Sequence, residues 1–361
     1  SSGVGTSGSV SLEPARIQRD GAGPRRGPAI AAHGRRKFLL HATGHRAYAR
    51  PAMAKKLDYN ATLQAREDLT DVLAVFKVVP DEPIPEGRWF IPGQYLTLGL
   101  NNEEKPELGS VRRAMSIASP PQQRGTIDFY IRYVTEPESD NPLTHLLWKM
   151  KAGDRINMTS KAVGKFNVDD TVGADDKRLR VLVAAGTGLA PFTSMVEAEL
   201  AANPNARLDN YVLMHGSSYA SELGYKARLE QLAREHGLHY LPTVSRPQAS
   251  PGWTGDSGRV EDFFKPERLE QTERAMGLAP GELRPDRAVI YICGLVGTIA
   301  MTVERLLCRG FIPFFPRIRK ALGIAAEVES TVYYEQYDNT PVVNINDPDE
   351  VARLKALMPA G

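Results

Sequence analysis

A glycine-rich turn between an apolar run and a helical stretch is the strongest local pattern for chemistry in this chain. Residues 185–191 are Ala-Gly-Thr-Gly-Leu-Ala-Pro. Gly186, Thr187 and Gly188 let a backbone approach a phosphate closely, and a helix that starts at Pro191 offers free N–H groups to an anion. The same pattern also forms tight structural turns. Because no Lys-Ser or Lys-Thr pair follows the glycines, a P-loop nucleotidase is disfavoured.

A second pattern, Arg113, Ala114, Met115 and Ser116, lies in a predicted strand. Alternation places Arg113 and Met115 on one face of the strand and Ala114 and Ser116 on the other. A guanidinium can pair with a pyrophosphate, and a serine hydroxyl can donate to a flavin ring nitrogen. Alone, the pattern also fits a solvated arginine beside a small strand residue.

Two further groups follow predicted buried strands. Cys293 and Gly294 end one strand, and ligands bind at the carboxyl ends of strands in open α/β sheets. Ser245 and Arg246 follow another strand, with Arg259 downstream, and two arginines there could clamp a 2′-phosphate. A buried small residue before a turn and ordinary surface charge are the alternative interpretations of these two groups.

The elements that carry these residues change in type near residue 176. Before it, short β-runs broken by turns predict a closed antiparallel barrel with one inserted helix at residues 142–150. After it, continuous apolar runs alternate with helical stretches, which predicts a doubly wound parallel sheet. The runs are 72–79, 94–98, 113–117 and 127–134 before the change, and 179–185, 211–215, 240–244 and 288–293 after it, with helices at 191–201 and 220–235.

We therefore expect a two-domain β plus α/β chain. Residues 53–176 form the antiparallel β-barrel, residues 177–338 form the doubly wound parallel-sheet domain, and residues 339–361 form a C-terminal extension with a helix at 350–358. The leader, residues 1–52, is predicted to be disordered and either transit-like or non-native.

Composition excludes several classes of protein. Of 45 Lys and Arg residues, nine lie in residues 1–52 beside two of the 43 acidic residues, so the remainder is mildly acidic and nucleic acid is an unexpected partner. Two cysteines are too few for an iron–sulfur cluster or a disulfide framework, which favours a reducing, cytoplasmic location, or an organelle if the leader is a transit peptide. No metal site and no membrane span are expected.

In order and position, these motifs resemble the ferredoxin–NADP reductase family, especially its bacterial-type members. The resemblance covers about residues 57–337. Its motifs are Pro-Gly-Gln-Tyr at 92–95, Arg-Ala-Met-Ser at 113–116, the glycine turn at 186–191, the strand–helix unit at 211–225, Thr-Val-Ser-Arg at 243–246, Tyr-Ile-Cys-Gly at 291–294 and Glu-Gln-Tyr at 335–337.

The resemblance implies a barrel that binds FAD and an α/β domain that binds NADP(H). Arg113 and Thr144 would hold the FAD pyrophosphate, and Ser116 would face flavin N5. The backbone at Tyr130, Arg132 and Val134 would line the ribityl chain. Cys293 would lie near the nicotinamide, Glu335 would serve proton and electron traffic, and Tyr337 would stack on the flavin and yield its place to nicotinamide.

The chain departs from the family's pattern at several positions. Met115 stands where the flavin signature usually has tyrosine, and Ser218 stands where many bacterial members carry arginine. About two dozen residues follow Tyr337, and residues 313–320 form an unusual insertion. In that insertion we expect Phe314 and Phe315 to pack, and Arg317, Arg319 and Lys320 to form an exposed basic face for an acidic ferredoxin.

The resemblance predicts a monomeric reductase that moves electrons between NADP(H) and ferredoxin or flavodoxin. One alternative is an NADH-preferring reductase component of an oxygenase system, which would need a separate iron–sulfur partner. Another, of a different class, is a flavin- or nucleotide-binding regulatory module without reductase activity.

Overall fold

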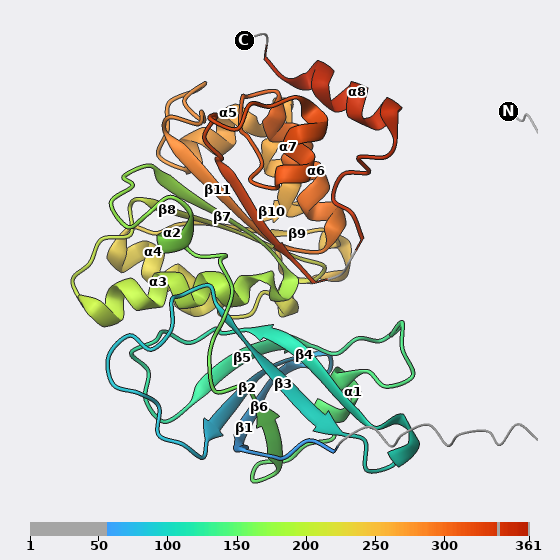
Figure 1. Ribbon diagram of the computed structural model, residues 1–361. Coiled ribbons are helices and arrows are strands. Elements are labelled where there is room, and N and C mark those ends of the chain that lie inside the picture. Colours follow the sequence, from blue (N-terminus) through green and yellow to red (C-terminus); the bar gives the residue numbers. More distant parts are fainter. Residues whose placement is uncertain (1–55, 338–339, 360–361) are drawn as a thin grey trace, which may run out of the picture. The chain divides into compact units, whose positions relative to one another are not determined.

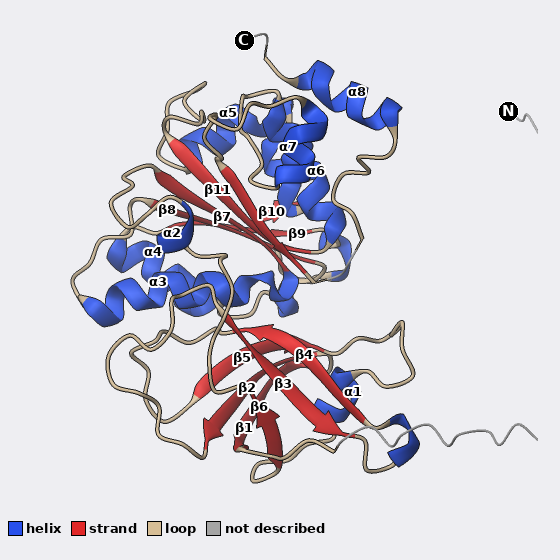
Figure 2. Ribbon diagram, in the orientation of Figure 1, coloured by secondary structure: helices blue, strands red, loops and turns tan. Residues whose placement is uncertain are grey.

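The computed structural model describes residues 56–337 and 340–359, so the predicted leader at 1–52 lies outside the described residues. A six-stranded antiparallel sheet is followed by a six-stranded parallel sheet with helices (Figures 1 and 2). This architecture confirms the predicted fold class.

The antiparallel sheet has the strand order β4-β3-β6-β1-β2-β5. Four of its strands coincide with the predicted β-runs, whereas β1 and β6 were not predicted individually. The strands are β1 (Ala61–Thr70), β2 (Leu73–Pro80), β3 (Tyr95–Asn101), β4 (Ser110–Ser116), β5 (Ile127–Arg132) and β6 (Arg155–Met158).

The barrel closes where its two edge strands, β4 and β5, meet. Ile117 forms an antiparallel bridge with Phe129. Beside it, the Ala118 N–H donates to the Asp128 carbonyl over 2.8 Å. Alternate residues such as Leu96 and Leu98 of β3 point inward to one hydrophobic core. Closure leaves Ser116 at the end of a strand whose position is fixed on both sides.

The parallel sheet has the order β10-β9-β8-β7-β11-β12. After β7 the chain adds β8, β9 and β10 on one side, and then returns to add β11 and β12 on the other side of β7. Strands β7 and β11 are therefore neighbours in the sheet although they are far apart in sequence. The strands are β7 (Leu179–Ala185), β8 (Tyr211–Ser217), β9 (His239–Val244), β10 (Asp256–Ser257), β11 (Ala288–Gly294) and β12 (Val332–Gln336).

Both faces of the parallel sheet are buried, which explains the continuous apolar runs. Val181 and Val183 of β7 pack into one hydrophobic cluster, and Leu182 and Ala184 pack into the other. Helices α3 and α4 cover the second face, whereas α6 and α7 cover the first (Figure 2). A strand that is covered on both faces therefore lacks the alternation of polar and apolar residues in its sequence.

The structure contains more helices than the sequence predicted. The predicted helix at 220–235 is interrupted, because a short 3-10 turn at Ala220–Glu222 precedes α4. The helices are α1 (Leu143–Leu147), α2 (Val168–Thr171), α3 (Ala190–Ala202), α4 (Lys226–His236), α5 (Pro266–Ala275), α6 (Val296–Leu307), α7 (Pro316–Leu322) and α8 (Pro348–Leu357). None of the helices in the described residues has the length and apolar character needed to cross a bilayer.

The structure contradicts part of the basic face predicted for the insertion at 313–320. Arg319 is only 8% exposed, and its guanidinium donates to the Ser330 hydroxyl and the Ala325 carbonyl over 2.7 and 2.8 Å. It therefore pins the loop after α7 and is not available for docking. Phe315 is 41% exposed, so it packs less than predicted, although it stacks on Tyr334. The cause is local: Pro316 starts a helix whose buried face includes Arg319.

Helix α3 ties the parallel-sheet domain to the barrel. The Thr193 and Ser194 hydroxyls donate to the carbonyls of Ala118 and Ser119 over 3.1 and 2.8 Å, and all four residues are buried. Buried hydroxyls need such partners, so these bonds fix one helix face against the end of the barrel.

A substitution at Gly93 can test the close packing between the barrel, the Phe166 segment and α3. Its φ is +104°, and an added Cβ would lie 2.1 Å from the Phe166 carbonyl oxygen and 2.7 Å from the Met195 methyl. We expect Gly93→Ala to lower the free energy of unfolding by about 2 to 4 kcal/mol, through strain and overpacking together. Chemical denaturation of the purified protein measures this loss.

Gly87→Ala is the matched control, because Gly87 also has a positive φ of +73° but has open space around its added Cβ. It should cost about 1 kcal/mol from backbone strain alone. Equal losses in the two variants would contradict the proposed contact.

Candidate active site

The candidate site lies where the strand order of the parallel sheet reverses, between β7 and β11. Ala184 of β7 is in register with Cys293 of β11, so both strands end at the same level. A one-turn 3-10 helix, Gly186–Leu189, follows β7 and leads into α3. Ligands bind in this crevice in open α/β sheets, and the start of α3 offers N–H groups to an anion.

Two glycines shape the turn for different reasons. A Cβ on Gly188 would lie 1.9 Å from the Cys293 carbonyl oxygen, so only glycine allows the turn to approach the end of β11. Gly186 has a φ of +56° and has nothing within 4 Å of a built Cβ. Its side therefore faces open space, as the approach of a phosphate requires.

Cys293, Tyr337 and the glycine turn form one hydrogen-bonded group. The Cys293 thiol donates to the Tyr337 hydroxyl over 3.4 Å, and that hydroxyl donates to the Thr187 carbonyl over 3.0 Å. Cys293 is fully buried, whereas Tyr337 remains 46% exposed. The phenol thus lies over the turn while part of its ring faces solvent.

The barrel reaches this group through Ser116. Its hydroxyl donates to a carboxylate oxygen of Glu335 over 3.1 Å, across 219 positions in the chain. Glu335 lies in β12, in register with Cys293 of β11. The structure therefore brings Ser116, Cys293, Glu335 and Tyr337 together, and their catalytic roles remain a prediction.

Burial perturbs both acidic groups of this cluster. It raises the pKa of Glu335 to about 7, although the Ser116 hydrogen bond acts in the opposite direction. Burial also raises the pKa of the Cys293 thiol, and the neighbouring Glu335 carboxylate adds to this effect. Near neutral pH the carboxyl can hold or release a proton, while the thiol keeps its proton.

The barrel residues predicted to hold FAD lie along β4, β5 and the start of α1. Arg113 is exposed, and its guanidinium donates to the Arg112 carbonyl over 2.8 Å. The Thr144 hydroxyl accepts from the Val134 N–H over 3.3 Å and so joins the start of α1 to the end of β5. Met115 is half-buried against the barrel core.

The side chains of Tyr130 and Arg132 point to the other domain. The Tyr130 hydroxyl accepts from the Gly224 N–H over 3.2 Å, and Arg132 pairs with Glu222 at 2.8 Å. Glu222 has a side chain that is only 7% exposed. These two side chains are therefore engaged in the domain contact, and the role of the strand's backbone in lining a ligand stays a prediction.

The residues predicted to hold a 2′-phosphate follow β9. Ser245 and Arg246 are exposed after the strand ends, and Arg259 is exposed near β10. Sequence reasoning missed Tyr219, whose hydroxyl accepts from Arg246 over 2.6 Å. Its position in a turn directly after β8 is the only signal that the sequence offered.

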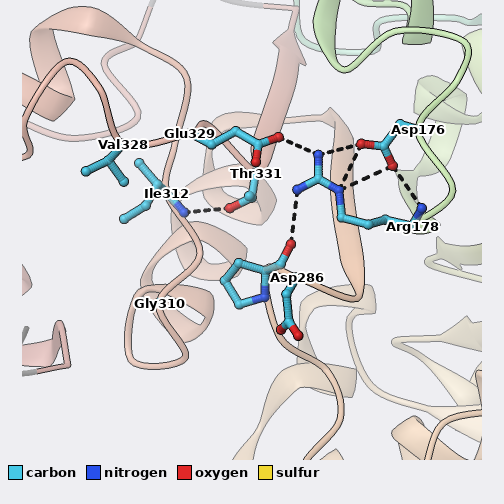
Figure 3. A pocket seen from close by; sticks show the side chains of 9 residues that line it. Asp176, Arg178, Asp286, Gly310, Ile312, Val328, Glu329 and Thr331 are labelled. Carbon is cyan, nitrogen blue, oxygen red and sulfur yellow. Dashed lines mark hydrogen bonds and ion pairs between the residues drawn. The ribbon is translucent and has the colours of Figure 1, made fainter.

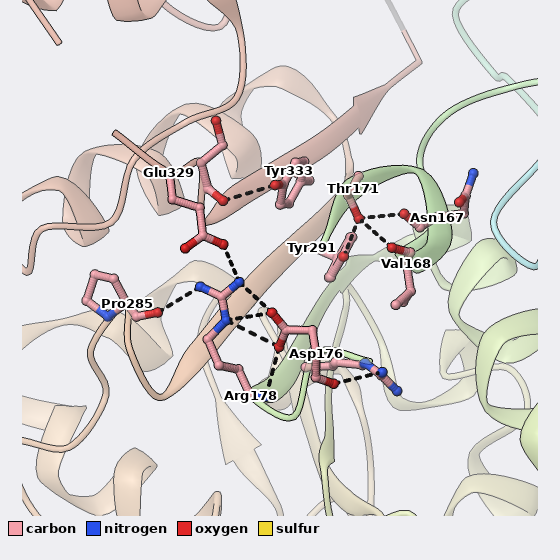
Figure 4. Close-up of polar contacts among 11 residues, drawn as sticks. Asn167, Val168, Thr171, Asp176, Arg178, Pro285, Tyr291, Glu329 and Tyr333 are labelled. Atoms are coloured by element: carbon pink, nitrogen blue, oxygen red, sulfur yellow. Dashed lines mark hydrogen bonds and ion pairs between the residues drawn. The ribbon is translucent and has the colours of Figure 1, made fainter. Parts of the chain in front are cut away.

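A surface depression lies elsewhere and is not the candidate site. It has a volume of about 510 Å³ and lies where β7, β11 and β12 begin (Figure 3). Arg178 spans it, held by Asp176 on one side and Glu329 on the other, and the nearby Thr171–Tyr291 hydroxyl contact continues this polar layer (Figure 4). Arg178 in this depression is thus paired with two carboxylates. No His, Cys, Asp and Glu cluster in the described ranges could hold a metal ion.

Comparisons with known proteins show which family and fold the chain resembles. Residues 182–304 match the family described as an oxidoreductase NAD-binding domain. The chain is 30% identical over 265 residues to the flavodoxin/ferredoxin–NADP reductase of Rhodobacter capsulatus, which covers 70% of this chain and 86% of that protein. It is 28% identical over 209 residues to the reductase component of a phenol 2-monooxygenase from Pseudomonas sp. strain CF600, covering 58% of this chain and 53% of that protein.

A solved structure shows the same fold. A ferredoxin–NADP reductase from Neisseria gonorrhoeae, with bound FAD and NADP, has a TM-score of 0.60 at 24% identity, covering 77% of this chain and 98% of that one. The fold and site thus define a two-domain, NAD(P)-binding oxidoreductase of the flavin reductase class. The chain belongs to the ferredoxin–NADP reductase family.

Glu335 generates a prediction about stability and pH. Its folded-state pKa of about 7 lies above the ordinary value of 4.5, so between these values the folded chain keeps a proton that the unfolded chain loses. Stability should therefore fall as pH rises from about 5 to about 7 and then level off. Glu335→Gln removes this titration and should exceed the parent's stability by about 2 kcal/mol at pH 8.

Denaturation midpoints at several pH values measure the effect. Glu327→Gln, at an exposed position in the loop before β12, is the control for replacing a carboxyl by an amide. If Glu335→Gln and the parent show the same pH dependence, the carboxyl does not titrate near neutrality.

Proposed function

We propose that this protein is an FAD-dependent reductase that transfers electrons between NADP(H) and a one-electron carrier protein, ferredoxin or flavodoxin. The contact between Ser116 and Glu335 carries this proposal, because it joins the arginine strand of the barrel to the crevice beside the glycine turn. Electron transfer between a flavin and a nicotinamide needs the two rings held face to face at short range. An inter-domain site of this kind would allow that arrangement.

The barrel fits the FAD that the proposal requires. Arg113 is exposed and has no acidic partner among the residues that the structure describes, so its guanidinium is free to pair with a pyrophosphate. Thr144 and the N–H groups at the start of α1 lie beside the end of β5. Ser116 ends the same strand as Arg113 and would face the flavin ring.

The crevice fits a dinucleotide. Gly186 leaves open space above the start of α3, and Gly294 ends β11 with an added Cβ only 2.8 Å from that of Ala185. The ends of β7 and β11 thus lie too close together for a side chain at Gly294. Ser245, Arg246 and Arg259 lie exposed after β9, at the same edge of the sheet, where the far end of the nucleotide would reach.

A bound flavin supplies the chemistry that couples a two-electron donor to a one-electron acceptor. The chain's own residues position and shield it. Glu335, with a pKa of about 7, holds or releases one proton beside Ser116. Cys293 stays a thiol and donates to Tyr337, whose hydroxyl must leave the Thr187 carbonyl before its ring can yield to a nicotinamide.

The oxygenase-reductase alternative has a specific observation in its favour. The similarity to the phenol 2-monooxygenase component is nearly as high as that to the Rhodobacter capsulatus reductase. The Glu261 carboxylate also lies 3.9 Å from Arg259, where it would compete with a 2′-phosphate. With only two cysteines in the sequence, a separate iron–sulfur protein would then have to complete the chain of electron carriers.

Arg113 tests the proposed flavin site. We expect Arg113→Ala to weaken FAD binding about 10- to 100-fold, because a charge-assisted contact with pyrophosphate is lost. Flavin released on dilution, followed by fluorescence, measures it. Arg112→Ala is the control, since Arg112 is an equally exposed neighbour on the opposite face of β4. A colourless parent protein, or bound flavin that NADPH does not bleach, would instead support the regulatory module.

Arg246 tests the nucleotide preference. The parent should oxidise NADPH in preference to NADH with an artificial dye as acceptor, and Arg246→Ala should reduce the NADPH to NADH ratio of kcat/KM about 10- to 100-fold. Arg234→Ala, on the exposed face of α4, is the control. A parent that prefers NADH would favour the oxygenase reductase, and an unchanged ratio in Arg246→Ala would remove the 2′-phosphate assignment.

A further inference from the structure

Tyr219 holds Arg246 by two contacts at once. Arg246 donates from Nη1 to the Tyr219 hydroxyl over 2.6 Å, and its guanidinium carbon lies 5.4 Å from the centroid of the Tyr219 ring. The first contact directs one N–H group of the guanidinium, and the second keeps the guanidinium near the ring. An exposed arginine without such contacts loses more rotamer freedom when it binds an anion.

The backbone holds these two side chains in adjacent loops. The Ser245 and Arg246 N–H groups donate to the carbonyls of Ser217 and Ser218, each over 3.0 Å. The Ser250 hydroxyl accepts from the Ala220 N–H over 3.0 Å and so closes the loop after β9 onto the loop after β8. Tyr219 and Arg246 therefore face each other from two turns that cannot separate independently.

Arg246 is the better placed of the two candidate arginines. Arg259 already has the Glu261 carboxylate 3.9 Å away, and Glu261 is 2% exposed, so the acid cannot move out to solvent. Within residues 56–337 and 340–359, no acidic side chain pairs with Arg246, and the neutral Tyr219 hydroxyl is its side-chain partner. A dianionic phosphate therefore meets less competition at Arg246.

We infer that Tyr219 is a positioning residue that presents Arg246 to the 2′-phosphate of NADP(H) and so sets the preference for NADPH over NADH. This inference rests on the proposed function and assigns its specificity. Ser218, where bacterial relatives are expected to carry arginine, leaves one phosphate contact missing. The Tyr219 contact compensates by ordering the arginine that remains.

Nucleotide fragments test this inference directly, without requiring turnover. Adenosine 2′,5′-bisphosphate carries the 2′-phosphate, and 5′-AMP lacks it. In calorimetric titrations of the purified flavoprotein, Tyr219→Phe should weaken binding of the bisphosphate about three- to fivefold and leave 5′-AMP unchanged. Tyr219→Leu, which also removes the ring, should weaken bisphosphate binding further. Tyr59→Phe, which removes a tyrosine hydroxyl from the barrel, is the control and should change neither affinity.

A double-mutant cycle separates positioning from direct contact. In the Arg246→Ala background, Tyr219→Phe should have no further effect, because Tyr219 acts through that arginine. In turnover, Tyr219→Phe should raise KM for NADPH about three- to fivefold and leave kcat and both NADH parameters unchanged.

Four results would overturn the inference: no effect of Tyr219→Phe, equal weakening of both fragments, an effect that persists without Arg246, or a parent that binds the two fragments equally. The proposed function fails separately. If the bisphosphate binds in a Tyr219-dependent way but the protein oxidises no NADPH, the nucleotide site stands and the reductase activity does not.

Discussion

The hydrogen bond between Ser116 and Glu335 is the interaction on which the candidate site depends. It joins residues separated by 219 positions, one at the end of a barrel strand and one in the last strand of the parallel sheet. Glu335 reaches Ser116 only because β12 pairs with β11 in a register that sets Glu335 beside Cys293. A slip of one residue would turn the carboxylate to the other face of the sheet. The chemistry of the site is therefore fixed by strand register.

Helix α3 also fixes the position of the barrel relative to the glycine turn. Its start follows the glycine turn, and its second turn donates two buried hydroxyls to the carbonyls of Ala118 and Ser119. Those carbonyls lie two and three residues after Ser116. The helix therefore fixes the distance between the turn that would hold a phosphate and the serine that would face a flavin. Buried hydroxyl bonds suit this purpose, because leaving any one of them unmade is costly.

Local patterns predicted the parts of this arrangement, and long-range contacts determined the rest. The apolar run at 179–185 predicted β7, because a strand buried on both faces must be apolar throughout. The glycine turn predicted the start of α3. Strands β1, β6 and β12 gave weaker signals, since they alternate or are short. Arg319 was predicted to be exposed from its charge alone, and the carbonyls that bury it come from a loop whose path the sequence does not reveal. Tyr219 was missed for the same reason, because its partner belongs to a different strand–loop unit.

The C-terminal extension packs against the parallel-sheet domain. Val342 and Val343 are buried in the core that underlies β11, and α8 packs against α6 and α7 with Leu354 2% exposed. Arg353 also pairs with Glu304 of α6. Tyr337 directly follows β12, and the packed part of the extension includes Val342 and Val343. In the proposed exchange with a nicotinamide, the hydrogen bonds from Cys293 and to Thr187 would set the position from which the Tyr337 ring moves.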